Sequence, residues 1–461
     1  MHKLSLLALA GAGLAAFTPP AYAVDGLFAT AVNIGIVTMQ ARSAFGLGKG
    51  KGMRQGAEAV FKAVNGKGGV HGRQINLLVG DDGCEPDKAI DETLMMIGQQ
   101  KVLSLFGHVG TPTVNAVLPI VKKMDVPLVG ALTGAMRLRQ PVTQQVLNVR
   151  ASYDAEAGTL VAHFIAKGAK SVAVFYQDGG FGAAVLSGTD KALKERNLAI
   201  AADGYFQRNT LAIKTGLAAM IDATPAAVVM VGSYAPLAAV IREGRATGLK
   251  SQLATASFVG TDNQAGDVGA TGDGVVIRQV VPFPDDNDLP IQRACRDALA
   301  ANGGGTLGWV TFEGCVTAKV MVVALERAGR APERAGLVKA LHSLQGPDRG
   351  GRKIAFAENN HQGLFDLFRT QIQGGKIAKP RWSQPGKAAP HDSPTQQPDT
   401  TARHPEHIPP PAGLVGLLRH RPGRRCRRQR CCRHPDPDRF AKPDRTGRAA
   451  AGQNLRAARA H

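Results

Sequence analysis

The 461-residue sequence has few cysteines, few aromatic residues and no long apolar run after its first two dozen residues. Charge or glycine interrupts every later apolar run within about 12 residues, whereas a helix needs about 20 to cross a bilayer. A later membrane span is therefore excluded. Aromatic side chains make up 5% of the chain, and Phe440 is the single one after residue 382.

Motifs that carry catalysis are also missing. The sequence has no Gly-x-Ser-x-Gly elbow and no His-Glu-x-x-His pair, and its histidines are scattered. Residues 46–50 have the glycine density of a phosphate loop but lack its Gly-Lys-Ser/Thr ending. Asp81 and Asp82 are neighbours at a strand end, so they point to opposite faces and are interpreted as turn residues. We expect neither enzymatic activity nor a cofactor.

The first 23 residues have the three parts of an export signal. Met1-His2-Lys3 is basic, residues 4–17 are apolar and uncharged, and Ala21-Tyr22-Ala23 matches the site cut by a signal peptidase. The apolar run is too short to span a bilayer. We expect the mature chain to begin near Val24 and to be periplasmic, where neither the genome nor cytosolic nucleotides are available as partners.

The net charge of +20 is concentrated at the end of the chain. Half of the excess falls after residue 382, together with 12 of the 27 prolines. Such a composition buries too little apolar surface to offset chain entropy, so residues 383–461 are expected to be disordered. Residues 424–434 are rich in arginine and cysteine. An RNA-binding arm is disfavoured, because an exported protein does not meet RNA. A zinc site is disfavoured as well, because it needs two ligand pairs at regular spacing, which this segment lacks. We favour translation of a GC-rich gene in a wrong frame, and expect no metal site.

Three cysteines lie in the body of the chain, Cys84, Cys295 and Cys315. An odd number allows at most one internal disulfide and leaves one thiol over. Cys295 and Cys315 fall on successive predicted helices, so they either form a disulfide or remain free and buried.

Apolar β-rich runs alternate with amphipathic stretches along most of the body. This alternation is typical of a parallel sheet covered by helices on both faces. The pattern restarts after residue 154, which indicates a second lobe. Helices predicted at 290–301, 309–328 and 332–344 have no strands of their own to cover, so we expect them to pack on the first lobe.

We therefore predict an α/β fold of two doubly wound parallel-sheet lobes joined by a multi-strand hinge. The N-terminal lobe is expected to comprise residues 24–154 plus 281–349, and the C-terminal lobe residues 155–280 plus 350–382.

Polar loops follow two strands of the first lobe, at residues 107–113 and 132–135. Open α/β sheets bind ligands at the carboxyl ends of their strands. Threonine hydroxyls and free backbone amides there would attract a carboxylate. Ordinary helix capping by threonine is the alternative interpretation.

Four motifs in order carry a family resemblance. They are residues 63–73 (AVNGKGGVHGR), 81–86 (DDGCEP), the 107–113 loop and 176–182 (YQDGGFG), to which Glu313-Gly314 in a long predicted helix adds. Through them the chain resembles the type I periplasmic solute-binding proteins of the leucine/isoleucine/valine-binding family, from about residue 32 to 376. The resemblance implies a two-lobed clamp that closes on a small ligand and docks on an ABC permease in the inner membrane. A clamp that reports its ligand to a membrane sensor kinase is the alternative.

The resemblance also implies which residues contact the ligand. Hydroxyls and backbone amides of the two first-lobe loops would hold a carboxylate, an aromatic would line the side-chain pocket, and second-lobe residues would close over the ligand. The first-lobe residues are Thr111, Thr113, Thr133, Gly134 and Ala135. The aromatic of the side-chain pocket is Phe45. The second-lobe residues are Phe181, Ser233 or Tyr234, and Ser257.

Two departures from the family pattern stand out. Ser257 occupies the place of the acidic residue that binds an α-ammonium group, and a buried ammonium without a carboxylate is costly. Either Asp178 or Asp262 takes that role, or the ligand has no α-ammonium. We expect a small carboxylate with an apolar or aromatic body, with branched-chain amino acids second. The family's disulfide partner for Cys84 falls near Gly110, so that bridge is absent.

Overall fold

The structure is a computed structural model that describes residues 25–40, 49–345 and 353–379. The predicted export signal, Phe45 and the predicted disordered tail lie outside the described residues.

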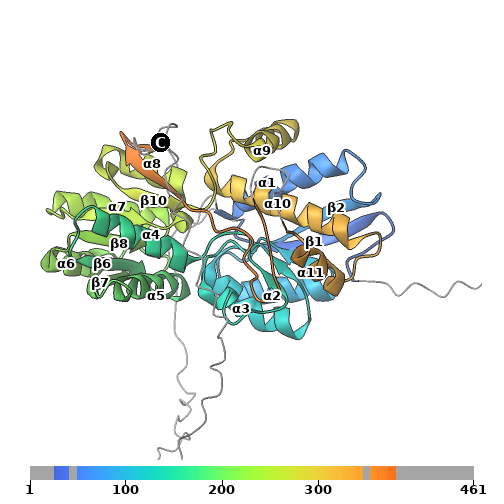
Figure 1. Ribbon diagram of the computed structural model, residues 1–461, viewed down its shortest axis with the longest axis horizontal. Coiled ribbons are helices and arrows are strands. Elements are labelled where there is room, and N and C mark those ends of the chain that lie inside the picture. The colour runs from blue at the N-terminus through green and yellow to red at the C-terminus, as the bar shows by residue number, and fades with distance from the viewer. Residues whose placement is uncertain (1–24, 41–48, 346–352, 380–461) are drawn as a thin grey trace, which may run out of the picture. The chain divides into compact units, whose positions relative to one another are not determined.

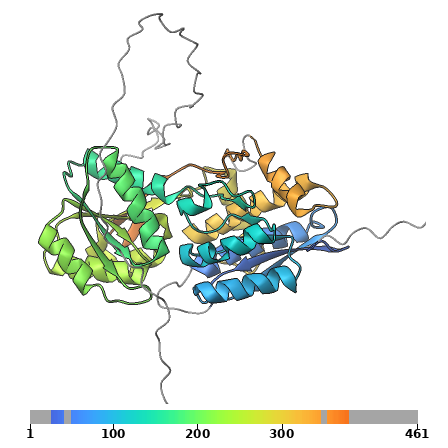
Figure 2. The same cartoon turned by 90° about the horizontal axis from the view of Figure 1, so that it is seen from below.

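The first sheet is parallel throughout. Its strands bury apolar residues on both faces, because helices cover both sides (Figure 2). One face packs on α1, α9, α10 and α11, and the other packs on α2 and α3. The sheet order is β2 (Gln74–Gly80), β1 (Ala31–Val37), β3 (Ser104–Phe106), β4 (Leu128–Val129) and β5 (Val146–Leu147). Its helices are α1 (Lys49–Asn65), α2 (Pro86–Gly98), α3 (Thr111–Lys123), α9 (Pro290–Ala301), α10 (Trp309–Ala328) and α11 (Arg334–His342), with the short η1 (Met136–Leu138) after β4.

The second sheet is mostly parallel and ends in two antiparallel strands. In β8 every residue is buried, and successive side chains pack alternately on α4 and α5 or on α6, α7 and α8. The order is β12 (Lys376–Ala378), β11 (Phe368–Gln373), β10 (Val276–Gln279), β9 (Gln252–Thr255), β8 (Ala227–Val231), β6 (Val172–Gln177) and β7 (Ile200–Phe206). Its helices are α4 (Tyr153–Ala166), α5 (Gly180–Lys194), α6 (Lys214–Ala223), α7 (Tyr234–Ala246) and α8 (Thr261–Val268), with the short η2 (Ser257–Val259) and η3 (Gly269–Gly272).

The predicted fold class is confirmed, and so is the return of the late helices to the first sheet. Helix α10 lies beside α1 (Figure 1), and the approach is close enough to require glycine on both helices. A Cβ at Gly56 would overlap the carbonyl oxygen of Thr311, and a Cβ at Gly314 would overlap that of Met53. Gly314 of the family-like Glu313-Gly314 pair is thus required by the packing of α10 on α1.

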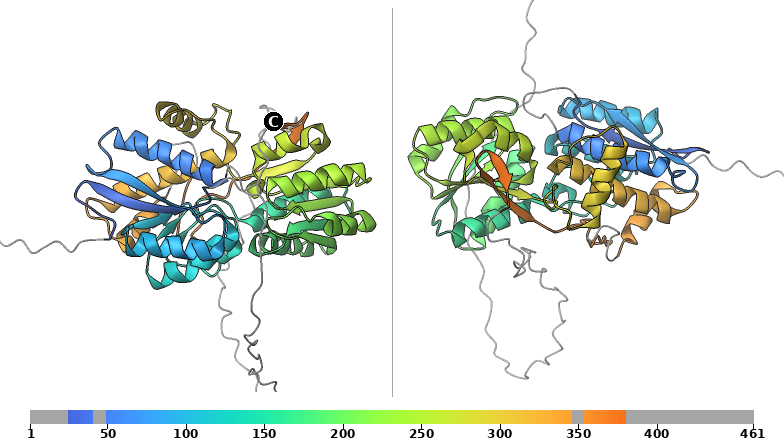
Figure 3. Two further views of the ribbon diagram at one scale, coloured as in Figure 1. Left: turned by 180° about the vertical axis from the view of Figure 1, so that it is seen from behind. Right: turned by 90° about the horizontal axis from the view of Figure 1, so that it is seen from above.

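Residues after α11 return to the second sheet later than expected. Ile354, Phe356 and Leu364 belong to the core that includes β1, α1 and α10. The chain joins the second sheet only at β11, which Figure 3 shows in orange beside the green and yellow elements. The predicted lobe limit at residue 350 therefore does not coincide with the packing.

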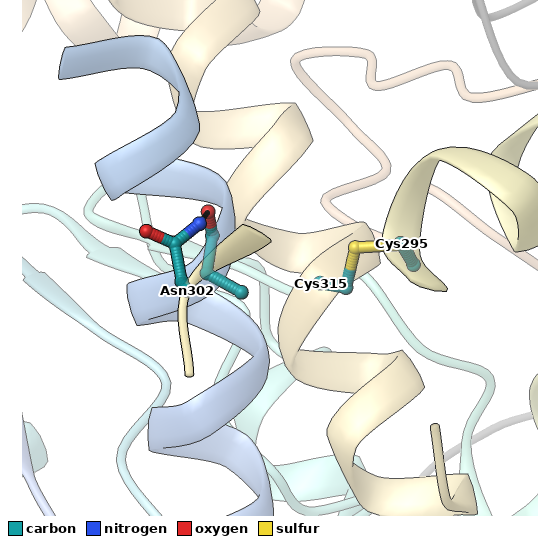
Figure 4. Close-up of a disulfide and its surroundings, with 4 residues drawn as sticks. Cys295, Asn302 and Cys315 are labelled. Carbon is teal, nitrogen blue, oxygen red and sulfur yellow. Dashed lines mark hydrogen bonds between the residues drawn. A yellow bond between two sulfur atoms is a disulfide. The ribbon is translucent and has the colours of Figure 1, made fainter. Parts of the chain in front are cut away.

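Cys295 on α9 and Cys315 on α10 form a disulfide, with 6.1 Å between their Cα atoms (Figure 4). Both are buried in the first lobe's core. At the end of α9, the Asn302 side chain donates to the carbonyl oxygen of Ala59 on α1 at 3.3 Å. The bridge and this hydrogen bond tie α9 to α10 and α1. Cys84 is a free cysteine.

Several elements were not expected from the sequence. Strand β5 has two residues, α8 is a short polar helix, and β11 and β12 lie past the last predicted helix. Helix α3 begins at Thr111, inside the predicted 107–113 loop. That early start matters because it places the predicted ligand loop on the first turn of a helix.

Candidate functional site

The two polar loops of the first lobe meet at their threonines. Thr111 begins α3 and Thr133 follows β4, and their hydroxyl oxygens are 2.7 Å apart. Both side chains are fully buried. The Ala135 amide donates to the Thr133 hydroxyl at 3.3 Å. Thr113, by contrast, donates to the carbonyl oxygens of Val109 and Gly110, which is local bonding at the start of the helix.

Tyr153, the first residue of α4, lies against these threonines. Its amide donates to the Gly134 carbonyl at 2.7 Å, and a Cβ at Gly134 would overlap the Tyr153 ring. Burial raises the pKa of Tyr153, whereas the nearby Thr133 and Thr111 hydroxyls lower it. The phenol oxygen is buried and makes no well-directed hydrogen bond among the described residues.

Three aromatic rings, those of Tyr153, Phe181 and Phe258, form a row that runs into the second lobe. Phe181, in the first turn of α5, has its ring centre 5.4 Å from that of Tyr153 and 5.0 Å from that of Phe258. These spacings are those of favourable aromatic pairs. Phe258 follows Ser257 in η2. The rings form an apolar surface between the threonine loops and η2.

Arg150 forms the charged centre of the site. Its guanidinium is buried, and it lies 3.0 Å from the Glu156 carboxylate and 3.4 Å from the Glu313 carboxylate. It also donates to the Ser257 hydroxyl. Burial lowers the pKa of Arg150, but Glu313 and Glu156 raise it by more. Burial raises the pKa of Glu313 to about 7, although Arg150 opposes the shift.

Ser257 lies next to the carboxylate of Glu156, which the sequence analysis did not identify as part of the site. Its amide donates to Glu156 at 2.7 Å, and its hydroxyl donates to the same carboxylate at 3.1 Å. Of the two expected substitutes, Asp178 is exposed, and Asp262 accepts a hydrogen bond from the Trp309 amide at the start of α10. Glu156 is therefore the carboxylate at this position, and it is already paired with Arg150.

A second arginine supports this network from behind. Arg139 is buried, and its guanidinium donates to the Gln362 side chain at 2.7 Å and to the carbonyls of Ala135 and Arg150 at 3.0 and 2.9 Å. Burial, and then the charge of Arg150, lower the pKa of Arg139 to about 9. The side chain holds together the chain segments around residues 135, 150 and 362.

Ser233 and Tyr234 lie at the start of α7. Ser233 is buried and Tyr234 is half-buried. A Cβ at Gly260 would lie 3.8 Å from a ring carbon of Tyr234 and 3.7 Å from the side chain of Lys49. Gly260 follows η2 directly, so Tyr234 lies at the edge of the same region as Phe258.

Sequence reasoning missed Arg150, Tyr153, Glu156 and Phe258. The first three follow β5, which is too short to give a recognisable strand pattern. Without that strand, the rule that ligands bind at strand ends could not be applied to them. The usable signal was local: five polar or aromatic residues stand close together between residues 150 and 156.

Within the described ranges, no group of three or more histidine, cysteine or acidic residues could hold a metal ion. In the same part of the chain, no helix has both the length and the apolar character needed to cross a membrane. A cavity of about 380 Å³ lies in the second lobe near His163, Arg245 and Lys250. None of the predicted site residues lines it.

Known proteins similar to this chain share its architecture. The family model described as periplasmic binding protein matches residues 31–376. A possible leucine/isoleucine/valine-binding protein from Rhodopirellula baltica SH 1 has 30% identity and a TM-score of 0.72, covering 79% of this chain and 98% of its own. A substrate-binding periplasmic protein from Ralstonia solanacearum has 25% identity and a TM-score of 0.70, with 75% and 98% covered. The leucine-specific-binding protein of Salmonella typhimurium is 23% identical over 265 residues, 56% of this chain and 70% of its own.

Proposed function

Because this chain belongs to the periplasmic binding protein family, a family of binding proteins rather than enzymes, we propose that it is an exported protein that captures a small carboxylate. The ligand is an amino acid or a related organic acid, held between the two lobes. The loaded protein then delivers this ligand to an ABC permease in the inner membrane.

The observation that carries the proposal is a buried polar and aromatic cluster built from both lobes. Thr111 and Thr133 come from the first lobe, Phe181 and Phe258 come from the second, and Tyr153 stands between them. Ligand pockets typically combine apolar walls with a few placed polar groups. A clamp that closes around its ligand needs such groups on both sides.

The connections between the lobes support a hinge. The chain crosses between the two sheets after β5, after β10 and before β11. Arg139 binds the first crossing through the Arg150 carbonyl and the third through Gln362. Asn148 and Gln362 also form a parallel bridge. Domain closure is expected to bend these few segments while each sheet moves as a unit.

The test is a thermal-shift panel of amino acids and aliphatic and aromatic acids on the purified full chain. A true ligand at about 100 times its Kd should add roughly 2.7 kcal/mol to the free energy of unfolding, which corresponds to a shift of several degrees. Thr133→Val should abolish this shift without unfolding the protein. Thr189→Val is the matched control, since Thr189 is equally buried but bonds only within α5. Equal shifts in both variants would contradict the site.

Delivery to a permease is tested in the source organism. Deleting the gene should reduce uptake of the radiolabelled acid identified in the panel, and restoring the gene should restore uptake. Unchanged uptake, together with a lost transcriptional response to the acid, would instead indicate a sensing role.

A further inference from the structure

An unbalanced positive charge lies beside the aromatic cluster. Lys49 is 4% exposed, and its Nζ atom is 4.2 Å from the centre of the Phe258 ring. Among the described residues, no carboxylate forms an ion pair with it, and the preceding residues 41–48 include no acidic side chain. The Cys84 thiol is the one described ionisable group that raises its pKa, against the larger lowering by burial. A buried ammonium in this state is costly unless an anion joins it.

The helix that carries Lys49 adds to the positive potential. Lys49 and Lys51 occupy the first turn of α1, and that turn has no acidic residue. A helix N-terminus carries a partial positive charge and unpaired amides, so cations there are unfavourable for the helix itself. Residues that destabilise their own helix are expected at functional sites, so the lysine at the start of α1 points to a functional role.

Thr38 supplies a second polar group at the same place. Its side chain is fully buried, and the hydroxyl has no hydrogen-bond partner among the described residues. The hydroxyl lies against Gly50, where a Cβ would overlap it. A glycine after Lys49 therefore lets the helix start approach the end of β1. The partnerless Thr38 hydroxyl thus lies against the first turn of the 17-residue helix that carries Lys49.

The buried charges around Arg150 are arranged differently, because they face partners of opposite sign. Arg150 faces Glu156 and Glu313, and Arg139 lies behind it, so two guanidinium groups accompany two carboxylates. Neither carboxylate is left over for an α-ammonium group of a ligand. Lys49 has no ion-pair partner among the described residues, and it therefore favours a ligand that carries a negative charge.

We propose that Lys49, Thr38 and the first turn of α1 bind the anionic group of the ligand, which is a monocarboxylate with an apolar or aromatic body and no α-ammonium group. This inference rests on the proposed solute-binding function. The body of the acid lies along Phe258 and Phe181, and its carboxylate replaces the ring as the partner of Lys49. Amino acids of the same size are disfavoured, because their ammonium group has no free carboxylate to bind.

Titration calorimetry on the purified full chain tests this with matched probes. Two acids, 4-methylpentanoate and 3-phenylpropanoate, are compared with leucine and phenylalanine, which add only the α-ammonium, and with 3-phenylpropanamide, which removes only the charge. We expect the acids to bind at least tenfold more tightly than either kind of analogue.

Variants assign the effect to this site. Lys49→Met should weaken acid binding at least 100-fold, and Thr38→Val, which keeps shape and removes the hydroxyl, about tenfold. Lys62→Met is the control, because Lys62 is exposed in the last turn of the same helix, far along the chain from the proposed site, and it should leave affinity unchanged. Circular dichroism confirms that each variant is folded.

Three results would overturn the inference. If leucine binds more tightly than 4-methylpentanoate, the ligand class is wrong. If the acids bind equally well to wild type, Lys49→Met and Thr38→Val, the anion site is wrong while solute binding stands. If no probe in this set or in the thermal-shift panel binds the wild type, the proposed function itself fails, and the inference fails with it.

Discussion

Replacing Lys49 by methionine should make the ligand-free protein more stable at neutral pH. Burial lowers the pKa of Lys49 from 10.5 to about 8, and each unit corresponds to about 1.4 kcal/mol. Folding with this ammonium charged therefore costs about 3 kcal/mol. The variant loses the contact with the Phe258 ring, which is worth about 1 kcal/mol. The expected net gain in the free energy of unfolding is about 2 kcal/mol.

The gain should depend on pH in a definite direction. Below pH 8 the side chain is charged in both the folded and the unfolded state, so the whole cost of burying the ammonium is present. As the pH rises from 8 towards 10.5, the folded state holds Lys49 neutral, and the unfolded chain progressively loses its proton as well. The cost then disappears. The advantage of methionine should shrink over this interval.

Urea unfolding followed by circular dichroism measures the effect at pH 7 and at pH 9.5. Lys51→Met, in the exposed position of the same turn, should change the free energy of unfolding by no more than about 0.5 kcal/mol. A Lys49→Met protein that unfolds at a lower urea concentration than wild type at pH 7 would refute the reasoning. Such a result would mean that the ammonium is compensated in the ligand-free protein.

Three further predictions concern the buried network and the disulfide. Arg150→Met should lower the free energy of unfolding by about 3 to 5 kcal/mol in urea titrations, because it leaves two carboxylates buried without their cation. Adding Glu156→Gln to this variant should recover part of the loss. No recovery would argue against an ion pair between Arg150 and Glu156. Burial raises the pKa of Glu313 from 4.5 to about 7, so the folded state holds this proton more tightly than the unfolded chain does. The resulting contribution to the free energy of unfolding is about 3 kcal/mol below pH 4.5, and it is lost as the pH rises to 7. Glu313→Gln should remove this pH dependence, measured as the difference from wild type in urea unfolding. Changing Cys295 and Cys315 together to alanine opens a 20-residue loop and should cost about 3 kcal/mol, seen as a lower melting temperature; the same melting temperature in both proteins would show that the bridge constrains little.

Much of the fold could be predicted because its elements follow local patterns. The residues of β8 form a continuous apolar run, and α9 and α10 begin and end where the sequence predicted. Strand β5 could not be predicted, because two residues carry no periodicity. The short α8 was missed for a related reason, since it is polar and has little apolar stripe to detect.

The candidate site was predicted less completely than the fold. The meeting of Thr111 and Thr133 follows from a local rule, because both stand after parallel strands of one sheet. The carboxylate beside Ser257 does not, because Glu156 is 101 residues away in the chain. A residue-by-residue comparison with the family shows that Ser257 lacks the usual carboxylate. It cannot show that Glu156, on another helix, supplies a carboxylate at the same place.

The sequence by itself determined the alternation of strands and helices, the two-lobed α/β class and the pair of cysteines on successive helices, since each depends on periodicity, composition or short spacing. The tertiary structure alone decided which charges are compensated. Arg150 meets Glu156 and Glu313, whereas Lys49 lies over the ring of Phe258 and forms no ion pair among the described residues, because the crossings between the lobes bring distant segments together. Burial then makes the difference energetically large, since an unpaired charge is tolerated in water and costly inside a protein.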